Sequence, residues 1–473
     1  MASWRRILLA GAGWLAMAAP AAAQIVGNQP GMMNDEGMRV PIPKAASVDL
    51  TRATVADGFT FLAGGDLLGP QSPLLGLEDR DFAKVVKLIQ GADVAFANHE
   101  GSAFDLNAFP GTRAAQSGGG YPLFSPALDR EFKAMGLDIV SMANNHAGDW
   151  GEAGLVATLD SVGRAGLVEA GAGGSLAQAR QAGVFQTPKG RVALIATAST
   201  FNPSTPAADG RGALKPRPGI STLRTTAANV VTAEEMALIR RLAAVRGRQA
   251  PDAPRVRLGG NTFEGPNAGG VTYTDASQLE GAGGTYVVGD GPRMTYTANP
   301  ADEKAILDSI STAKRTDDLV AFSIHAHETA GLADSTVPAD FLPLLFHKAI
   351  DAGADIVIRH GPHELNGIEI YKGKPIFYSL GSLFFGVGGP GGRSPPADYD
   401  SAVAVTEFKD GRPAVVRVYP LKIVIDRPAL FSAPVLATGA EAQRILEGIQ
   451  KDSEPFGTRI RIENGVGVIE IAR

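Results

Sequence analysis

Histidine, carboxylate and amide residues gather in five short clusters, and each cluster directly follows a hydrophobic, strand-like run. The clusters are Asp66, Asn98-His99-Glu100, Asn144-Asn145-His146 with Asp149, His325-Ala326-His327-Glu328, and His360-Gly361-Pro362-His363. Six of the seven histidines fall in them, and the chain has no cysteine. Imidazole, carboxylate and amide groups form a nitrogen and oxygen ligand set that suits Zn²⁺, Mn²⁺ or Fe. Two such ions about 3.5–4 Å apart would activate water for hydrolysis, and a neighbouring histidine would protonate the leaving group.

Each cluster also has a structural interpretation. A single aspartate after a strand, such as Asp66, is often a turn former or helix cap, and Asp149 is placed to cap a helix that begins at 151. His347 lies in the middle of a predicted helix, and we interpret it as a structural or surface residue. The close pairs His325/His327 and His360/His363 favour a metal site, because imidazoles at such spacing converge readily on one ion.

The elements that must position these residues alternate between strands and helices. Apolar patterning predicts strands at 59–66 (ending in a Gly-Gly-Asp turn), 93–98, 138–144, 191–199, 319–325 and 355–360. It predicts helices at 81–90, 127–135, 151–165, 176–181 and 338–352, and a further helix that starts at Pro300 with Asn299 as its N-cap. Hairpins follow at 367–382 and 402–421, then a helix at 440–450 and a last strand at 465–472. This rhythm predicts an α/β layered core, in which ligands bind beyond the carboxyl ends of the strands.

The pattern also divides the chain. Residues 1–23 have the basic start, apolar run and small residues of a secretory signal peptide, with an uncleaved anchor as the alternative. Residues 24–58 form an irregular N-terminal extension, 59–425 form the main domain, and 426–473 supply a C-terminal helix and strand packed on the core. Residues 203–300 interrupt the rhythm as an insertion, with a helix at 233–245 and a β-rich flap at 255–298. No later segment is apolar enough to span a membrane, so the mature protein is expected in the periplasm or outside the cell.

Composition excludes several classes of protein. The 44 Lys and Arg residues and 49 Asp and Glu residues give a net charge of −5, which argues against nucleic acid as a partner. The absence of cysteine excludes a disulfide framework, an Fe–S cluster and a thiol nucleophile. A chain of 473 residues that is 44% apolar and 20% charged is globular.

The motifs GGD (64–66), NHE (98–100), ANNHAGDWGEAGL (143–155), SIHAHE (323–328) and IRHGPHELNGIEIYKGKPIFYSLGSLFF (358–385) resemble the bacterial capsule-synthesis, or poly-γ-glutamate synthesis, CapA family. The resemblance implies the calcineurin-like metallophosphoesterase superfamily, a four-layer α/β/β/α sandwich and a site for two divalent metal ions. The ligands or site-lining residues that it implies are Asp66, Glu100, Asn145, His325, His360 and His363. It also implies His146 as the acid or base, beside Asp66 as a second catalytic residue. The chain departs from the superfamily's opening Asp-x-His motif, because Leu67 and Leu68 follow Asp66.

Substrate contacts are expected from residues beside the ligands and from local cations. We predict substrate-binding roles for Asn98, Asn144, His327, Arg217 and Arg359. Arg217 opens an Arg-Pro-Gly motif that resembles one found in part of the family.

Three functions follow from these features. The first is a metal-dependent hydrolase that acts on a phosphoester or on an amide-linked envelope or capsule polymer such as poly-γ-glutamate. The second is a non-catalytic factor that binds or assembles the polymer with other capsule-synthesis proteins. The third is a metal-independent peptide epimerase that uses His and Asp as two bases.

Overall fold

The computed structural model describes residues 53–69, 77–245, 285–331, 336–386 and 396–472. All of them belong to one compact unit, Val48–Arg473. The predicted signal peptide, most of the predicted flap at 255–298 and most of the N-terminal extension lie outside the described residues. Within the described part of the chain, no helix is long and apolar enough to cross a membrane.

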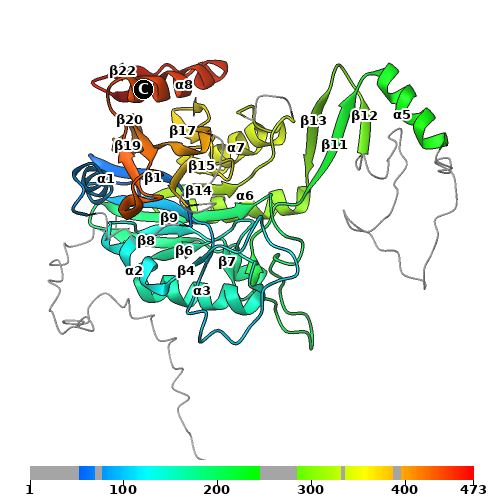
Figure 1. The fold of residues 1–473 in the computed structure, drawn as a ribbon, viewed down its shortest axis with the longest axis horizontal. Coiled ribbons are helices and arrows are strands. Elements are labelled where there is room, and N and C mark those ends of the chain that lie inside the picture. The colour runs from blue at the N-terminus through cyan, green and yellow to red at the C-terminus, as the bar shows by residue number, and fades with distance from the viewer. Residues whose placement is uncertain (1–52, 70–76, 246–284, 332–335, 387–395, 473) are drawn as a thin grey trace, which may run out of the picture. The chain divides into compact units, whose positions relative to one another are not determined.

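The larger of two main sheets has ten strands and carries the first part of the site (Figure 1). Its central order is β22 (Arg461–Glu463), β23 (Val466–Glu470), β20 (Arg412–Ile423), β19 (Asp400–Lys409), β1 (Phe59–Leu68), β2 (Val94–His99), β5 (Ile139–Ser141) and β6 (Val168–Ala170). Two more strands lie off this path: β18 (Ser382–Phe385) beside β1, and β21 (Pro434–Leu436) beside β20. Strands β1, β2, β5, β6 and β18 run parallel, so their carboxyl ends meet at one edge.

The second sheet has six strands and carries the rest of the site. Its order is β16 (Ile368–Tyr371), β17 (Lys374–Phe377), β15 (Ile356–His360), β14 (Leu319–His325), β9 (Gly190–Ala198) and β8 (Gly183–Thr187). Side chains alternate between its faces. Leu194 and Ala321 join the core shared with the larger sheet, whereas Ile195 and Phe322 join a second core with helices α6 (Pro300–Lys314) and α7 (Phe341–Ala352). The two sheets therefore face each other, and α6 and α7 cover the outer face of the smaller one.

The remaining helices have between 4 and 15 residues. They are α1 (Arg80–Gln90), α2 (Pro126–Ala134), α3 (Gly151–Ala165), α4 (Leu176–Ala179), α5 (Ala233–Val245) and α8 (Gly439–Ser453), with 3₁₀ turns η2 (Pro396–Tyr399), η3 (Pro428–Leu430) and η4 (Glu454–Phe456). Small sheets pair β3 (Ser102–Ala103) with β4 (Leu123–Phe124), and β7 (Ala172–Gly173) with β10 (Gly219–Ile220). Helix α8 and strand β23 both contact β20.

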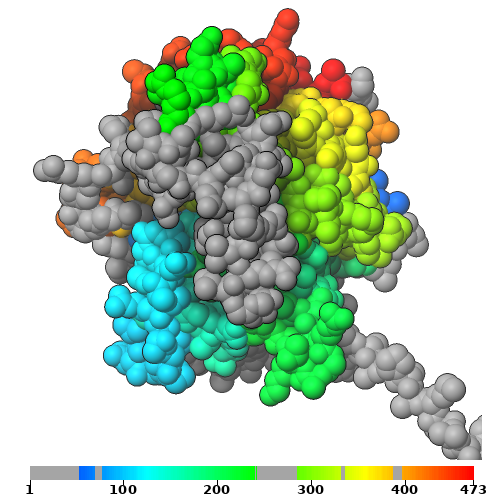
Figure 2. Space-filling view, turned by 90° about the vertical axis from the view of Figure 1, so that its right-hand side faces the viewer, coloured from blue at the N-terminus to red at the C-terminus, as the bar shows by residue number. Residues whose placement is uncertain are grey.

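The interruption after residue 203 contains a three-stranded sheet, β12 (Thr285–Val288), β11 (Thr225–Val231) and β13 (Arg293–Ala298). Asn299 donates its backbone N–H to the carbonyl of Arg224, so the chain leaves and returns at neighbouring points. Figure 2 looks onto this side of the molecule and shows cyan residues near position 120 and yellow residues near position 350 on opposite sides of the face.

The mixed α/β prediction is confirmed, and several local predictions are too. Helices 151–165 and 233–245 and strand 319–325 have the predicted bounds. The Asn299 side chain caps α6 by accepting hydrogen bonds from the backbone N–H groups of Ala301 and Asp302.

Three local predictions are wrong. The Gly-Gly-Asp sequence does not end its strand, because β1 continues to Leu68 through irregularities on both sides of Asp66. The predicted hairpin 367–382 ends at Phe377, and the chain then crosses to the other sheet, where Ser382 pairs with Asp66. Strand 138–144 ends at Ser141, because Asn144 turns away to bind Asn98 and the backbone of His99.

Candidate metal centre

The side chain of Asp66 contacts residues of both sheets. It lies near the end of β1 with a fully buried side chain. Its Oδ1 accepts a hydrogen bond of 2.8 Å from Asn98 Nδ2 on the neighbouring strand β2. Its Oδ2 accepts a 3.2 Å bond from the backbone N–H of Gly361 and lies 3.1 Å from His363 Nδ1, both just after β15 of the smaller sheet.

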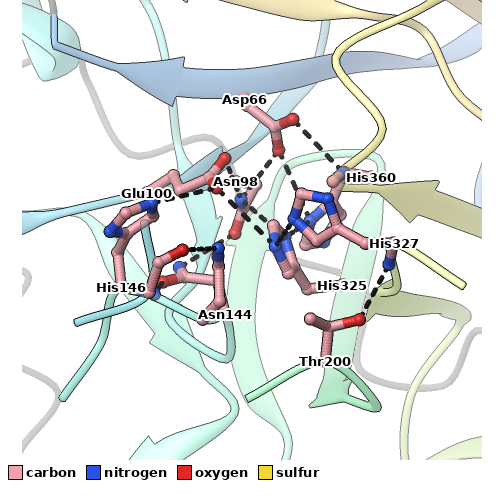
Figure 3. A network of polar contacts seen from close by, with 12 residues as sticks. Asp66, Asn98, Glu100, Asn144, His146, Thr200, His325, His327 and His360 are labelled. Atoms are coloured by element: carbon pink, nitrogen blue, oxygen red, sulfur yellow. Dashed lines mark hydrogen bonds and ion pairs between the residues drawn. The ribbon is translucent and has the colours of Figure 1, made fainter. Parts of the chain in front are cut away.

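Three histidines on or just after strands of the smaller sheet, His325, His327 and His360, lie close to Asp66 and to one another (Figure 3). His325 and His360 end the parallel strands β14 and β15 in register with each other, and their Nδ1 atoms lie 2.9 Å apart. His325 Nε2 lies 3.0 Å from His327 Nε2, and His360 Nδ1 lies 3.5 Å from Asp66 Oδ1. A neutral imidazole has one N–H donor and one acceptor nitrogen. Three rings in mutual contact therefore have few N–H groups for the hydrogen bonds between them.

Glu100 forms the other side of the cluster. Its Oε1 lies 3.6 Å from His325 Nε2 and 4.0 Å from His146 Nε2, and it has no hydrogen-bond partner within the described residues. Ligand atoms of Asp66, His325 and His360 lie within 4.8 Å of one another. The same holds for Glu100 with His325 and His327, and for Asp66 with Glu100 and His363. A buried carboxylate oxygen without a donor, surrounded by ring nitrogens, is the environment that a divalent cation satisfies.

His146 faces the cluster from the loop before α3. Its Nδ1 lies 2.7 Å from Asp149 Oδ2, which orients the ring and leaves Nε2 toward Glu100. Asp149 Oδ1 also accepts from the backbone N–H of Gly118 at 2.7 Å. The prediction that Asp149 caps α3 is wrong, because the N-cap residue is Trp150, which makes no side-chain capping bond.

The adjacent asparagines contribute differently. Asn144 Nδ2 donates to the backbone carbonyl of His99 at 2.8 Å and to Asn98 Oδ1 at 3.3 Å, and Asn144 Oδ1 accepts from the backbone N–H of His146. Asn145 Nδ2 donates to the carbonyl of Gly118, whereas its buried Oδ1 has no partner among the described residues. Asn145 therefore has a buried acceptor without a donor within the described residues, and its role as a metal ligand stays a prediction.

His363 adopts a left-handed backbone conformation with φ of 61°, which is uncommon for a residue with a side chain. Its ring Nδ1 lies close to both Asp66 Oδ2 and Ser382 Oγ, at 3.1 and 3.2 Å. Strained backbone of this kind persists where surrounding contacts enforce it, often at functional sites.

The two buried carboxyl groups have opposite pKa shifts. Burial alone would raise the pKa of Asp66, but the hydrogen bond and charge of His363 and the charge of His360 lower it to about 2. Burial and the charge of Asp66 raise the pKa of Glu100 well above its usual value. Two like charges this close favour one ionised and one protonated group unless a cation lies between them.

Burial favours the neutral form of His325, His327 and His360. Burial and the charge of His327 lower the pKa of His325 well below its usual value. Burial also lowers the pKa of His327 to about 3, with the charge of His363 acting in the same direction. Burial lowers the pKa of His360 to about 4, although the charge of Asp66 opposes this. Neutral imidazole is the form that binds a metal.

The guanidinium groups of the two arginines predicted to bind substrate have partners outside the cluster. Arg359 is fully buried, and its guanidinium donates to the backbone carbonyls of Ala326, Glu328 and Tyr378 and to Asn366 Oδ1. Arg217 donates to the carbonyl of Pro206, and within the described residues no contact joins it to the cluster. Geometry thus gives no support to a substrate contact by either residue. His347, interpreted as structural, contacts Glu369 at 2.7 Å and stacks on Tyr371.

Three hydroxyl residues that contact the histidines of the cluster were not predicted from the sequence. Thr200 Oγ1 accepts from the backbone N–H of His327 and donates to Glu328 Oε2. Ser323 Oγ lies 2.7 Å from His360 Nε2, and Ser382 Oγ contacts His363. Ser323 could have been predicted from the sequence, because residues two apart in a strand lie on the same face and Ser323 is two residues before His325. The Thr200 contact could not, because it depends on how the chain folds.

Comparison with known proteins identifies the family. The family model described as bacterial capsule synthesis protein PGA_cap matches residues 76–387, more than half of the chain. The chain belongs to this family. The matched region includes Glu100, His146, His325, His360 and His363, and the resemblance inferred from the motifs is confirmed.

Similar proteins match this chain over different lengths and at different identities. The uncharacterized protein y4sH of Sinorhizobium fredii is 36% identical over 460 residues, which cover 89% of this chain and 95% of the relative. The PGA biosynthesis protein CapA of Bacillus subtilis is 34% identical over 154 residues, covering 33% of this chain and 37% of the relative. A probable polyglutamine synthesis accessory protein of Mycobacterium tuberculosis is 28% identical over 194 residues, covering 39% and 47%.

Proposed function

We propose that this protein is an exported, metal-dependent hydrolase of the capsule-synthesis family. Its substrate would be a phosphoester or an amide-linked envelope or capsule polymer such as poly-γ-glutamate. The observation that carries the proposal is the convergence of two buried carboxylates and four imidazoles from both sheets, with Glu100 Oε1 lacking a donor among the described residues. The names of the Bacillus subtilis and Mycobacterium tuberculosis relatives support the polymer.

The donor groups fit two adjacent cations. They form three overlapping sets: Asp66 with His325 and His360, Glu100 with His325 and His327, and Asp66 with Glu100 and His363. Mn²⁺, Zn²⁺ and Fe all accept such nitrogen and oxygen ligands. Bound divalent ions supply Lewis acidity and lower the pKa of water by several units.

The protein's own residues supply proton transfer and orientation. His146 would donate from Nδ1 to Asp149, which would stabilise the imidazolium form, and in that form the ring would give its Nε2 proton to the leaving group. Asn98 donates to Asp66 and accepts from Asn144, so it would hold the Asp66 carboxylate in place beside the loop that carries Asn144. His327, which like His363 is only partly buried, would be among the first residues to meet the substrate.

The proposal extends to fold and location. The two facing sheets with α6 and α7 outside the smaller one support a four-layer metallophosphoesterase-like sandwich over residues 59–425. The predicted signal peptide at 1–23 supports export, and other capsule-synthesis proteins would act beside it on the polymer.

Metal content and hydrolysis test the proposal together. Purified protein would be stripped with a chelator, reloaded with Mn²⁺, Zn²⁺ or Fe²⁺, and assayed on phosphomonoesters, phosphodiesters and γ-glutamyl oligomers. We expect up to two ions per chain, and activity that is lost on stripping and restored on loading. His360→Gln should lose metal and reduce turnover at least 100-fold, whereas the matched variant His347→Gln should change neither.

The outcomes separate the alternatives. Hydrolysis that persists in fully stripped protein would contradict metal dependence. Polymer binding without cleavage of any substrate would leave a binding factor as the function, and deuterium exchange at Cα without cleavage would indicate an epimerase.

A further inference from the structure

His99 lies between two residues of the cluster, but its side chain points to the opposite face of β2. Successive side chains of a strand alternate between faces, so Asn98 and Glu100 reach the cluster while His99 does not. The His99 ring is fully buried and lies 5.0 Å from the ring of Phe124 and 6.5 Å from that of Phe132. A hydrophobic residue would fill this position at lower cost, because a buried imidazole must find a partner.

That partner is a carboxylate shared by three elements. His99 Nε2 lies 2.9 Å from Asp129 Oδ1 of α2, and Asp129 Oδ2 accepts a 2.5 Å bond from Ser161 Oγ of α3. All three side chains are buried, and within the described residues Asp129 forms no ion pair with lysine or arginine. Strand β2, helix α2 and helix α3 are therefore joined at one polar point inside an apolar core.

The same residue also reaches the site through its backbone. The His99 carbonyl accepts a 2.8 Å bond from Asn144 Nδ2, and the next residue, Glu100, donates its backbone N–H to the carbonyl of Leu67 at 3.2 Å. The rotation of β2 about its own axis decides where Asn98 and Glu100 point. A directional hydrogen bond fixes that rotation more narrowly than apolar packing does, because it allows one ring orientation.

We infer that His99 is a positioning residue, which the Asp129–Ser161 pair locks so that Asn98 and Glu100 face Asp66 and His325. The inference concerns the cluster on which the proposed function rests. Its geometric part holds whether or not the loaded protein is a hydrolase.

The test replaces the polar lock by apolar residues. The double variant His99→Leu/Asp129→Leu removes both partners, so that neither is left buried alone. His99→Gln keeps a nitrogen donor at the Nε2 position and serves as the conservative variant. His347→Leu/Glu369→Leu removes another His–carboxylate contact, remote from the cluster, as the matched control.

Two readouts are needed. Crystal structures of the metal-free variants would give the distance from Asn98 Nδ2 to Asp66 Oδ1, which is 2.8 Å here. Co²⁺ titration, followed by its visible absorption, would give affinity and ligand geometry. We expect the double variant to lose the Asn98–Asp66 bond and to bind Co²⁺ at least tenfold more weakly. His99→Gln and the control should stay within threefold of the unmodified protein.

The results distinguish the two claims. An intact Asn98–Asp66 bond with unchanged Co²⁺ affinity in the double variant would overturn the positioning role. If the unmodified protein takes up no Co²⁺, the proposed metal chemistry fails, and the crystal distances alone judge His99. If the double variant does not fold, Ser161→Ala serves instead: weaker Co²⁺ binding supports the inference, and unchanged binding overturns it.

Discussion

At the scale of single residues, one buried arginine next to the cluster acts on its histidines through charge and hydrogen bonds. Arg359 lies on β15 next to His360, and burial lowers its pKa to about 10, so it is still a cation at neutral pH. Its charge acts to lower the pKa of both His327 and His360. Its N–H groups also hold the backbone carbonyls of Ala326 and Glu328 on either side of His327. One buried arginine thus holds the backbone on both sides of His327 and adds to the effect of burial in lowering the pKa of that ring.

Replacing Arg359 with leucine should destabilise the protein strongly. The change leaves the buried carbonyls of Ala326 and Tyr378 and Asn366 Oδ1 without the Arg359 donor, and an unsatisfied buried group costs about 1–3 kcal/mol. We expect the free energy of unfolding in urea to fall by roughly 3 kcal/mol or more. Arg315→Leu is the control: this exposed arginine bonds only its own helix among the described residues, so the change should alter stability by less than about 0.5 kcal/mol. Equal losses in the two variants would contradict this role for Arg359.

At the scale of elements, the approach of β18 to β1 controls the position of Asp66. A Cβ atom on Gly65 would lie 1.8 Å from the carbonyl oxygen of Gly381, which is backbone and cannot move aside. Glycine is therefore required immediately before Asp66, and Ser382 follows Gly381 directly into the pairing with Asp66. The Gly-Gly sequence allows this close approach, which explains why it does not terminate the strand.

Gly65→Ala should separate β18 from β1 and displace Asp66. We expect a loss of about 3 kcal/mol or more in unfolding free energy, because strand backbones would have to move apart. Gly163→Ala is the opposite case: it lies within α3 with no atom within 4 Å of the added methyl, so it should stabilise by about 0.5–1 kcal/mol. Thermal and urea unfolding of both variants measure the difference. A Gly65→Ala protein of normal stability would show that β18 does not constrain β1.

Sequence patterning predicted the parallel strands and most helices, because their apolar periodicity is strong. It also predicted that the polar clusters at the strand ends would meet, and Asp66, Glu100, His325, His360 and His363 do lie together. The ligand roles of these residues and of Asn145 came from the resemblance to the family. It missed the crossing of the chain from β17 to β18, because a short apolar run carries no information about which sheet it joins. It placed Asp149 at a helix cap for a similar reason: local spacing favours the cap, whereas the contact with His146 depends on the folded loop.

At the scale of the whole molecule, the cluster should make the stability of metal-free protein depend on pH. The pKa values of His325, His327 and His360 lie below their unfolded value near 6.5. As the pH falls below 6.5, the unfolded chain takes up protons that the folded protein cannot, so the free energy of unfolding decreases. Each ring contributes roughly 1 kcal/mol per pH unit until its folded pKa is reached. Glu100 has a raised pKa and opposes this trend, but three rings outweigh one carboxyl group.

Urea unfolding in the presence of chelator, from pH 7.5 to 4.5, measures this dependence. We expect the midpoint to fall with pH in the unmodified protein, to fall less in His327→Gln, and to fall more in Glu100→Gln. A midpoint independent of pH across this range would refute the account of the buried rings.

The division of donors between the sheets has a mechanical consequence. Asp66 and Glu100 belong to the ten-stranded sheet or the residue just after it, whereas His325, His327, His360 and His363 belong to the six-stranded sheet and the turns that follow it. A cation held between them would fasten one layer to the other at the edge where substrate enters. Metal binding would then also make the packing of the two sheets more rigid, and the metal-free protein would be the more flexible form.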